Sequence, residues 1–230
     1  MNDKWDTSSK VLSRRIVTTE DGSTSIEIPE MNEMYHSRKG AIKESQFVYI
    51  DHGYNLCTSS PINVLEIGMG TGLNVLLTLI ESKRQQRTTY FHTLEPYPLN
   101  TNEWAQLNFE KHLSIAKETL QLIHETKSDE ELEINEYFKF QLSKTKLELC
   151  QLNNNQYDVV YFDAFAPNKQ ANPWQLDNIQ KVYDCLRPGG ILTTYCAQGQ
   201  FKRNLLQVGF SVTNPEGPMG KREITVAYKK

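Results

Sequence analysis

The chain has 230 residues, a formal net charge of −3 and 38% hydrophobic residues, which is typical of one α/β domain that buries about 70% of its unfolded surface without a disulfide or metal. No apolar run approaches the ~18 residues that cross a bilayer, so we expect a cytoplasmic protein with no membrane partner. The small net charge excludes nucleic-acid binding by the whole surface, and the four cysteines show no metal-ligand spacing with the histidines, so no metal is expected.

Residues 1–60 are predicted to form an amino-terminal extension that packs on the main domain. Two short alternating segments, 15–17 and 25–28, flank a turn signal at 20–23 and predict a β-hairpin. A polar elbow at 34–41 and a helix-like segment at 44–50 follow. The remaining residues, 61–230, are predicted to form a single core domain.

The core domain alternates between the periodicities of strands and helices. Strands are predicted at 64–67, 89–94, 137–142, 157–162, 191–195, 210–212 and 223–228, and helices at 73–80, within 100–133 as a pair, at 172–186 and at 198–208. This alternation predicts an α/β fold with a mostly parallel seven-stranded sheet and helices on both faces. Ligand sites are expected at the carboxyl ends of the strands.

Residues 63–74 contain the first informative motif, a buried strand followed by glycines spaced as G-x-G-x-G and then by an apolar helix. Free N–H groups at a helix amino terminus favour an anionic ligand group, and the glycines let the backbone approach it closely. A dinucleotide fingerprint has the spacing G-x-G-x-x-G instead. Glu66 beside the loop would repel a pyrophosphate but suits the cationic amino acid end of S-adenosyl-L-methionine, although a glycine turn without a ligand is the alternative.

Glu95 follows the next predicted strand, where a carboxylate can accept both hydroxyls of a ribose. A solvated strand end is the alternative. Asp163 follows another buried strand, at a place suited to orienting an amine and accepting its proton. Phe165 and Trp174 are predicted to form a stacking wall for a base. The alternative is that Asp163 caps a loop and that the aromatic residues belong to the core.

At this point the sequence resembles the methyltransferase domain of the MnmC family. The motifs are EIGMGTGLN at 66–74, YHS at 35–37, GA at 40–41, ES at 44–45, Glu95, D-x-F-x-P-x-K at 163–169 and GPMGKRE at 217–223. The resemblance implies the fold of class I S-adenosyl-L-methionine-dependent methyltransferases, which is Rossmann-like, and a stand-alone MnmD-type protein that lacks the family's FAD-dependent oxidoreductase domain.

The resemblance also implies methyl transfer to the 5-aminomethyl group of 5-aminomethyl-2-thiouridine at the tRNA wobble position. The partner would be a tRNA anticodon stem-loop, and a separate FAD-dependent or uridine-modifying enzyme would supply the aminomethyl precursor. Asp163 matches the catalytic aspartate. The predicted cofactor-binding residues are Glu66, Gly68, Gly70, Thr71, Gly72, Asn74, Glu95 and Asp163, and the predicted substrate-binding residues are Tyr35, Phe165, Lys169, Trp174, Lys221 and Arg222.

The chain departs from the family pattern where adenine is expected. The family's Gly-Asp after the strand at 137–142 is replaced by Ser143-Lys144-Thr145, so backbone groups are a candidate for adenine recognition. The family's proline eight residues after the aspartate is Ala171. Other functions compatible with the sequence are a spermidine synthase-like aminopropyltransferase, which needs more acids to hold a polyamine, and a catalytically idle RNA-binding module.

Overall fold

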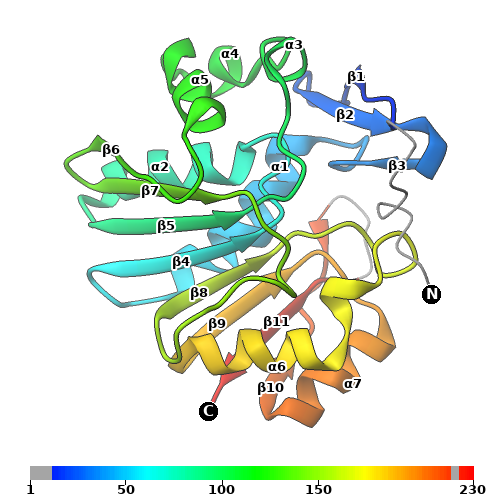
Figure 1. Cartoon of the computed structure of the whole chain (residues 1–230), viewed down its shortest axis with the longest axis vertical. Coiled ribbons are helices and arrows are strands. Elements are labelled where there is room, and N and C mark those ends of the chain that lie inside the picture. Colours follow the sequence, from blue (N-terminus) through cyan, green and yellow to red (C-terminus); the bar gives the residue numbers. More distant parts are fainter. Residues whose placement is uncertain (1–11, 219–222) are drawn as a thin grey trace.

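A computed structural model of the chain describes residues 12–218 and 223–230. Its centre is an eight-stranded sheet with the strand order β10-β11-β9-β8-β4-β5-β7-β6 (Figure 1). The strands are β4 (Ile62–Ile67), β5 (Thr89–Leu94), β6 (Glu131–Asn135), β7 (Phe138–Ser143), β8 (Tyr157–Phe162), β9 (Leu186–Thr194), β10 (Phe210–Thr213) and β11 (Thr225–Lys229). The predicted α/β architecture, with a mostly parallel sheet, is confirmed.

The parallel strands β9, β8, β4, β5 and β7 form the middle of the sheet, and antiparallel strands complete both edges. The chain runs outward from β4 through β5 to β7 on one side and from β8 to β9 on the other. The strand order therefore reverses between β4 and β8. In open α/β sheets a crevice for ligands forms beyond the carboxyl ends of the strands at such a point.

Two hydrophobic cores cover the two faces of the sheet, and β4 shows how alternation assigns residues to them. Val64 packs in the core under α2 (Leu73–Gln85) and α5 (Lys117–Glu125). Leu65 and Ile67 pack in the core under α6 (Leu176–Cys185) and α7 (Gly199–Val208). Successive side chains of a strand point to opposite faces, so Glu66 points toward α2. The other α-helices of the described residues are α1 (Ala41–Ser45), α3 (Thr101–Trp104) and α4 (Phe109–Leu113).

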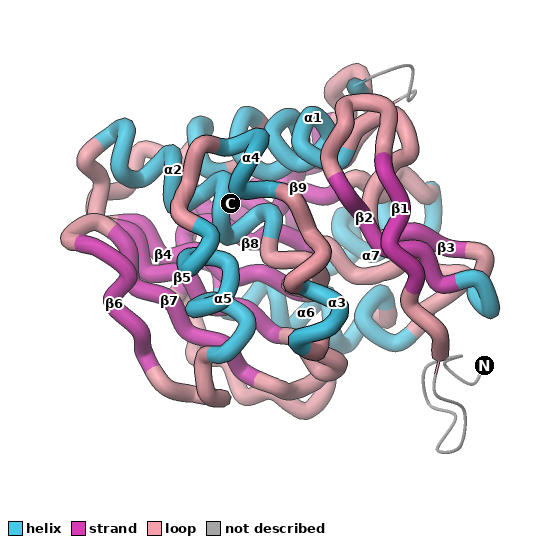
Figure 2. The backbone as a smooth tube through the Cα atoms, turned by 90° about the horizontal axis from the view of Figure 1, so that it is seen from above, coloured by secondary structure: helices cyan, strands magenta, loops and turns pink. Residues whose placement is uncertain are grey.

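The extension forms a small sheet beside the carboxyl ends of the central strands (Figures 1 and 2). The predicted hairpin is present as β1 (Arg15–Thr18) and β2 (Thr24–Ile28), and β3 (Glu33–Met34) adds a third strand. After α1 the chain continues as a π-helical segment, η2 (Gln46–Asp51), which packs on α2 and β9. Short 3₁₀ segments complete the described elements: η1 (Pro29–Met31), η3 (Tyr54–Leu56) and η4 (Asn172–Trp174).

The predicted count of seven strands is wrong, because residues 100–133 hold more than a pair of helices. They contain the short helices α3, α4 and α5, and β6 begins at Glu131. The alternating sequence Glu131-Leu132-Glu133-Ile134 suits an edge strand that is half exposed, and Leu132 pairs with Phe140 of β7. Because the residues before Glu131 have helical spacing of apolar residues, the change to the two-residue period of a strand was not predicted.

Neither a membrane-spanning helix nor a cluster of metal ligands is present in residues 12–218 and 223–230. No helix in these ranges combines the length and the apolar character needed to cross a membrane. In the same part of the chain, no three His, Cys, Asp or Glu side chains come together as a metal site.

Candidate active site

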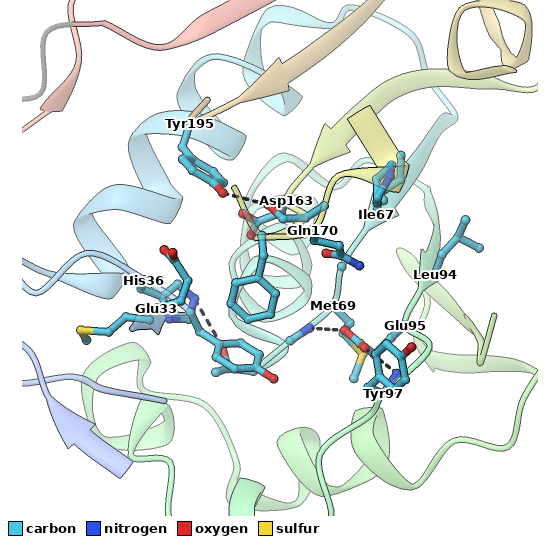
Figure 3. A pocket seen from close by; sticks show the side chains of 18 of the residues that line it. Glu33, His36, Ile67, Met69, Leu94, Glu95, Tyr97, Asp163, Gln170 and Tyr195 are labelled. Carbon is cyan, nitrogen blue, oxygen red and sulfur yellow. Dashed lines mark hydrogen bonds between the residues drawn. The ribbon is translucent and has the colours of Figure 1, made fainter. Parts of the chain in front are cut away.

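A cavity of about 380 Å³ lies at the carboxyl ends of β4, β5, β7 and β8 (Figure 3). Its wall is formed by the glycine loop after β4, by the loops after β5, β7 and β8, and by the amino-terminal extension. The volume is in the range of pockets that hold a cofactor-sized ligand. The cavity therefore occupies the place where the fold predicts a ligand site.

The glycine loop is packed so closely that side chains would not fit. Gly68 has a φ of +94°, and a Cβ there would lie 2.6 Å from the carbonyl oxygen of Asp163. Gly70 has a φ of +53°, and its Cβ would lie 2.7 Å from the ring of Tyr35. Gly68, Gly70 and Thr71 line the cavity, whereas Gly72 is the residue before α2 and does not.

Glu95 lies on the cavity wall and binds the glycine loop directly. Its Oε2 accepts the N–H of Gly70 at 2.9 Å, and its Oε1 accepts the N–H of Tyr97 at 2.8 Å. Burial raises the pKa of Glu95, while these backbone N–H groups and the nearby Arg14 guanidinium lower it. Each carboxylate oxygen has a second lone pair, so Glu95 can still accept hydrogen bonds from a ligand.

Asp163 lies opposite Glu95 on the cavity wall, with both carboxylate oxygens held by neighbours. The Tyr49 hydroxyl donates to Oδ1 at 2.5 Å, and the Asn74 amide donates to Oδ2 at 2.8 Å. The same amide nitrogen of Asn74 donates to Oε1 of Glu66 at 3.0 Å. Asn74 therefore links the two carboxyl groups, and Asp163 is fixed in orientation before any ligand arrives.

Glu66 is not on the cavity wall, contrary to its predicted place against the amino acid end of the cofactor. Its side chain is fully buried on the α2 face of the sheet, where Oε2 accepts the hydroxyl of Thr93 at 2.7 Å. Burial, with a further contribution from the charge of Asp163, raises the pKa of Glu66 to about 8. Burial thus favours the protonated form of Glu66, and Asn74 connects this side chain to Asp163.

The two predicted aromatic residues of the base-stacking wall lie in different surroundings. Phe165 lines the cavity and meets Tyr35 edge to face, with ring centroids 5.0 Å apart. Trp174 is buried in the core against Phe162 and Phe201, and its indole N–H donates to the Phe165 carbonyl oxygen at 2.8 Å. Trp174 can therefore hold the loop that carries Phe165, but it does not face the cavity.

Of the three predicted cations, Lys169 lies in the described part of the chain. The Lys169 ammonium donates to the carbonyl oxygen of Met31 at 2.5 Å and lies 3.9 Å from a carboxylate oxygen of Glu33. These contacts tie the loop after β8 to the extension, and Lys169 itself does not line the cavity. Lys221 and Arg222 lie outside the described residues.

Sequence reasoning missed several residues that line the cavity, namely Glu33, Glu44, Tyr49, Tyr97, Glu148 and Tyr195. Tyr49 reaches Asp163 across 114 residues of chain, so no local spacing relates the two. Glu44 belongs to a family motif, which was the one signal for it. It is 6% exposed and accepts the backbone N–H of Ser37 at 2.7 Å.

Comparison with known proteins agrees with this geometry. A family profile described as S-adenosyl-L-methionine-dependent methyltransferase matches residues 101–230, more than half of the chain. The uncharacterized protein MJ0670 of Methanocaldococcus jannaschii is 26% identical over 222 residues, which cover 93% of this chain and 59% of that protein. The tRNA 5-methylaminomethyl-2-thiouridine biosynthesis bifunctional protein MnmC of Leptospira interrogans is 27% identical over 217 residues, which cover 86% of this chain and 32% of MnmC.

Solved structures share the fold. The crystal structure of MNMC2 from Aquifex aeolicus superposes with a TM-score of 0.79 at 22% identity, covering 96% of this chain and 72% of that one. Spermidine synthase from Thermotoga maritima superposes with a TM-score of 0.61 at 15% identity, covering 96% and 71%. The chain spans about a third of the length of the MnmC relative, and the resemblance to the MnmC methyltransferase domain is confirmed. The chain belongs to the S-adenosyl-L-methionine-dependent methyltransferase family.

Proposed function

We propose that this protein methylates the primary amine of 5-aminomethyl-2-thiouridine at the wobble position of tRNA. The observation that carries the proposal is Asp163, fixed by Tyr49 and Asn74 on the wall of a cavity beside the glycine loop. The relatives named for the biosynthesis of 5-methylaminomethyl-2-thiouridine in tRNA support the choice of acceptor. Residues 61–230 act as the catalytic core in this proposal, and the described part of the extension within residues 1–60 contributes to the cavity wall, for example Tyr35 and Tyr49.

The residues on the wall fit the cofactor of the family. Gly68, Gly70 and Thr71 present backbone to the cavity, and Glu95 offers a carboxylate to ribose hydroxyls. Asp163 and Glu95 both line the cavity, so two carboxyl groups face a cationic ligand there. When bound, S-adenosyl-L-methionine supplies a methyl group on a cationic sulfur.

Asp163 would receive the acceptor amine. An alkylammonium has no lone pair, so the amine must be neutral when its nitrogen forms the new bond to carbon. A carboxylate at hydrogen-bond distance can direct that lone pair and then accept the proton that the methylated nitrogen loses. Tyr49 and Asn74 each donate to one oxygen of Asp163, and a carboxylate oxygen can accept more than one hydrogen bond, which would include one from the amine.

The uridine ring and the rest of the tRNA would be bound by residues other than Asp163. Phe165 and Tyr35 offer aromatic edges and faces to a flipped base. Lys221 and Arg222 are proposed to contact phosphates of the anticodon stem-loop. A separate FAD-dependent or uridine-modifying enzyme would supply the aminomethyl group. A protein that modifies tRNA in this way would be cytoplasmic.

An aminopropyltransferase is the second candidate, because the extension places several acidic side chains on the cavity wall. Glu27, Glu33 and Glu44 line the cavity, and such carboxylates are what a polyamine requires. The shared fold with spermidine synthase is compatible with both reactions. The acceptor molecule distinguishes the two reactions, since one acceptor is a nucleoside in tRNA and the other is a free diamine.

Nucleoside mass spectrometry tests the proposal. Purified protein is incubated with S-adenosyl-L-methionine carrying a labelled methyl group and with tRNA bearing 5-aminomethyl-2-thiouridine. We expect the label in 5-methylaminomethyl-2-thiouridine. In a parallel incubation with decarboxylated S-adenosyl-L-methionine and putrescine, we expect no spermidine. Label absent from tRNA, with spermidine formed instead, would support the second candidate.

A further inference from the structure

Arg14, the residue before β1, joins the extension to the loop that follows β5. Its guanidinium donates to the carbonyl oxygens of Tyr97 at 2.6 Å and Pro98 at 3.4 Å, and to Oε2 of Glu103 at 3.0 Å. The Arg14 side chain is 11% exposed. A single, largely buried cation of the extension thus spends its donors on one loop of the core domain.

This loop also fixes Glu95, the carboxylate proposed to receive the ribose hydroxyls. The backbone N–H of Tyr97 donates to Oε1 of Glu95 at 2.8 Å, and the carbonyl oxygen of the same Tyr97 accepts from Arg14. Tyr97 is therefore held from both sides. At the far end of the loop, Glu103 accepts the backbone N–H of Asn100 at 2.8 Å and caps α3. Arg14 thereby stabilises the whole segment from Glu95 to α3.

The charge of Arg14 acts on Glu95 as well. Burial raises the pKa of Glu95, whereas the N–H groups of Gly70 and Tyr97 and the Arg14 guanidinium lower it. Glu95 is 8% exposed, so a nearby cation reduces the cost of keeping its carboxylate ionised. An ionised carboxylate accepts a stronger hydrogen bond from a hydroxyl than a neutral acid does. The geometry and the charge of Arg14 thus have the same consequence for Glu95.

We infer that Arg14 is a positioning residue for cofactor binding, because it fixes the loop and the carboxylate that receive the ribose of S-adenosyl-L-methionine. Arg14 itself is not on the cavity wall, so it acts through Tyr97 and Glu95. The extension would then support the cofactor end of the cavity, in addition to the end where Tyr49 bonds Asp163. The inference rests on the proposed contact between Glu95 and the ribose, and it does not depend on the tRNA acceptor.

Arg87 provides a matched control, because its guanidinium also ties the extension to the core domain. It donates to the carbonyl oxygens of Ser59 at 2.7 Å, Cys57 at 2.8 Å and Tyr54 at 3.3 Å. Arg87 precedes β5, whereas Glu95 follows it, so the two residues lie at opposite ends of this strand. None of the four residues in this set of contacts lines the cavity. A variant of Arg87 therefore loses similar contacts without disturbing Glu95.

Calorimetry with two ligands tests the assignment. The probes are S-adenosylhomocysteine and its analogue in which hydrogen replaces both ribose hydroxyls. Arg14→Met keeps an apolar stem and removes the charge and the donors. Coupling between residues of one hydrogen-bond network is worth about 10-fold in an equilibrium constant, so Arg14→Met should bind S-adenosylhomocysteine about 10-fold more weakly than the wild type does. It should bind the analogue with nearly wild-type affinity, because that ligand lacks the groups that Glu95 receives.

Arg87→Met should keep the wild-type preference for S-adenosylhomocysteine, even where it lowers the free energy of unfolding. In Arg14→Lys one ammonium replaces the fork of donors, so its preference should lie between those of the wild type and Arg14→Met. This variant provides a second test if Arg14→Met does not fold.

Equal weakening of both ligands in the Arg14 variant that folds, or no weakening of either, would overturn the inference and leave Arg14 as a fastening of the extension. A wild type without any preference would remove the ribose assignment of Glu95 together with the inference. Both results can be told apart from a failure of the proposed function, because absence of tRNA methylation would leave the affinities for the two ligands unchanged.

Discussion

The hydroxyl of Tyr49 donates to Oδ1 of Asp163 at 2.5 Å, and this contact joins the extension to the reacting end of the cavity. Tyr49 lies in the π-helical segment η2, and such segments are frequent at functional sites. Burial and the nearby carboxylate raise the pKa of Tyr49 well above its ordinary value, so the hydroxyl stays a donor. Asn74 holds the other oxygen of Asp163 from α2.

Tyr49→Phe should therefore slow catalysis without weakening cofactor binding. Losing one hydrogen bond to a charged group corresponds to about 1.5–3 kcal/mol, so we expect a rate about 10- to 100-fold lower under single-turnover conditions. Tyr54→Phe is the control, because it removes a buried hydroxyl that bonds Thr89 at 2.8 Å away from the cavity. A wild-type rate in Tyr49→Phe would show that Asn74 alone orients Asp163.

Glu66→Gln should change how stability depends on pH. The pKa of Glu66 rises from 4.5 to about 8 in the folded chain, so the folded state holds a proton that the unfolded chain releases. The stability from this proton is complete below about pH 4.5 and is lost as pH rises through 8, at no more than about 1.4 kcal/mol per pH unit. Glutamine mimics the neutral acid and should lose this dependence.

Urea unfolding at pH 6, 7, 8 and 9 measures the effect as the difference between the two proteins. The free energy of unfolding of the wild type should fall relative to Glu66→Gln up to about pH 8 and then run parallel to it. The lowered pKa values of His92 and His124, about 4 each, are present in both proteins and cancel in the difference. Parallel curves over the whole range would show that Glu66 is ionised in the folded protein.

Glu95→Ala should weaken cofactor binding. Ribose hydroxyls would lose a charged acceptor, and Gly70 would lose the partner of its N–H, so we expect a loss of about 1–3 kcal/mol by calorimetry with S-adenosyl-L-methionine. Glu118→Ala removes an exposed acid of α5 that does not line the cavity and should bind normally. Undiminished affinity in Glu95→Ala would remove the ribose assignment.

Replacing both Lys221 and Arg222 with alanine should weaken tRNA binding and reduce the salt slope of the affinity by about 1–2 units. Each phosphate contact releases condensed counterions, and its loss lowers the slope. The exposed pair Lys117 and Lys127 serves as the control double variant. Binding of S-adenosyl-L-methionine should be the same in both. An unaltered salt slope in the first variant would place the tRNA surface elsewhere.

Local sequence predicted the parts of the site that lie within one strand and its following loop. Gly68, Gly70, Thr71, Glu95 and Asp163 were predicted in this way as site residues, and all five line the cavity. The sequence did not predict Tyr49, because a contact across 114 residues depends on how η2 packs on the sheet. The pleat of β4 turned Glu66 away from the cavity, although its position beside the loop suggested otherwise.

The edge strand β6 and the position of the loop after β7 could not be predicted from the sequence, for the same reason. Both depend on pairing with β7, since β6 is fixed by its register on β7 and the loop after β7 is placed by the contact between Glu95 and Ser143. Register between strands is set by packing of the whole sheet, and short segments do not encode it by themselves. The sequence alone therefore did not identify Glu148 as a residue of the cavity wall.

The central claim is that Asp163 acts directly on the acceptor amine. Asp163→Asn keeps the shape and can still bond Tyr49 and Asn74, but it removes the charge and the basicity. Positioning and proton transfer of this kind contribute about 10²–10⁴-fold in rate, so we expect a fall of at least about 10²-fold while the fold survives.

Single-turnover methylation of tRNA bearing 5-aminomethyl-2-thiouridine, followed across pH for the wild type and Asp163→Asn, tests this claim most directly. The wild-type rate should rise with pH as the neutral fraction of the amine grows, and the variant should remain at least about 10²-fold slower throughout. Circular dichroism and cofactor binding should match the wild type. A variant within a few-fold of the wild type at every pH would contradict the account and leave Asp163 as a structural cap of its loop.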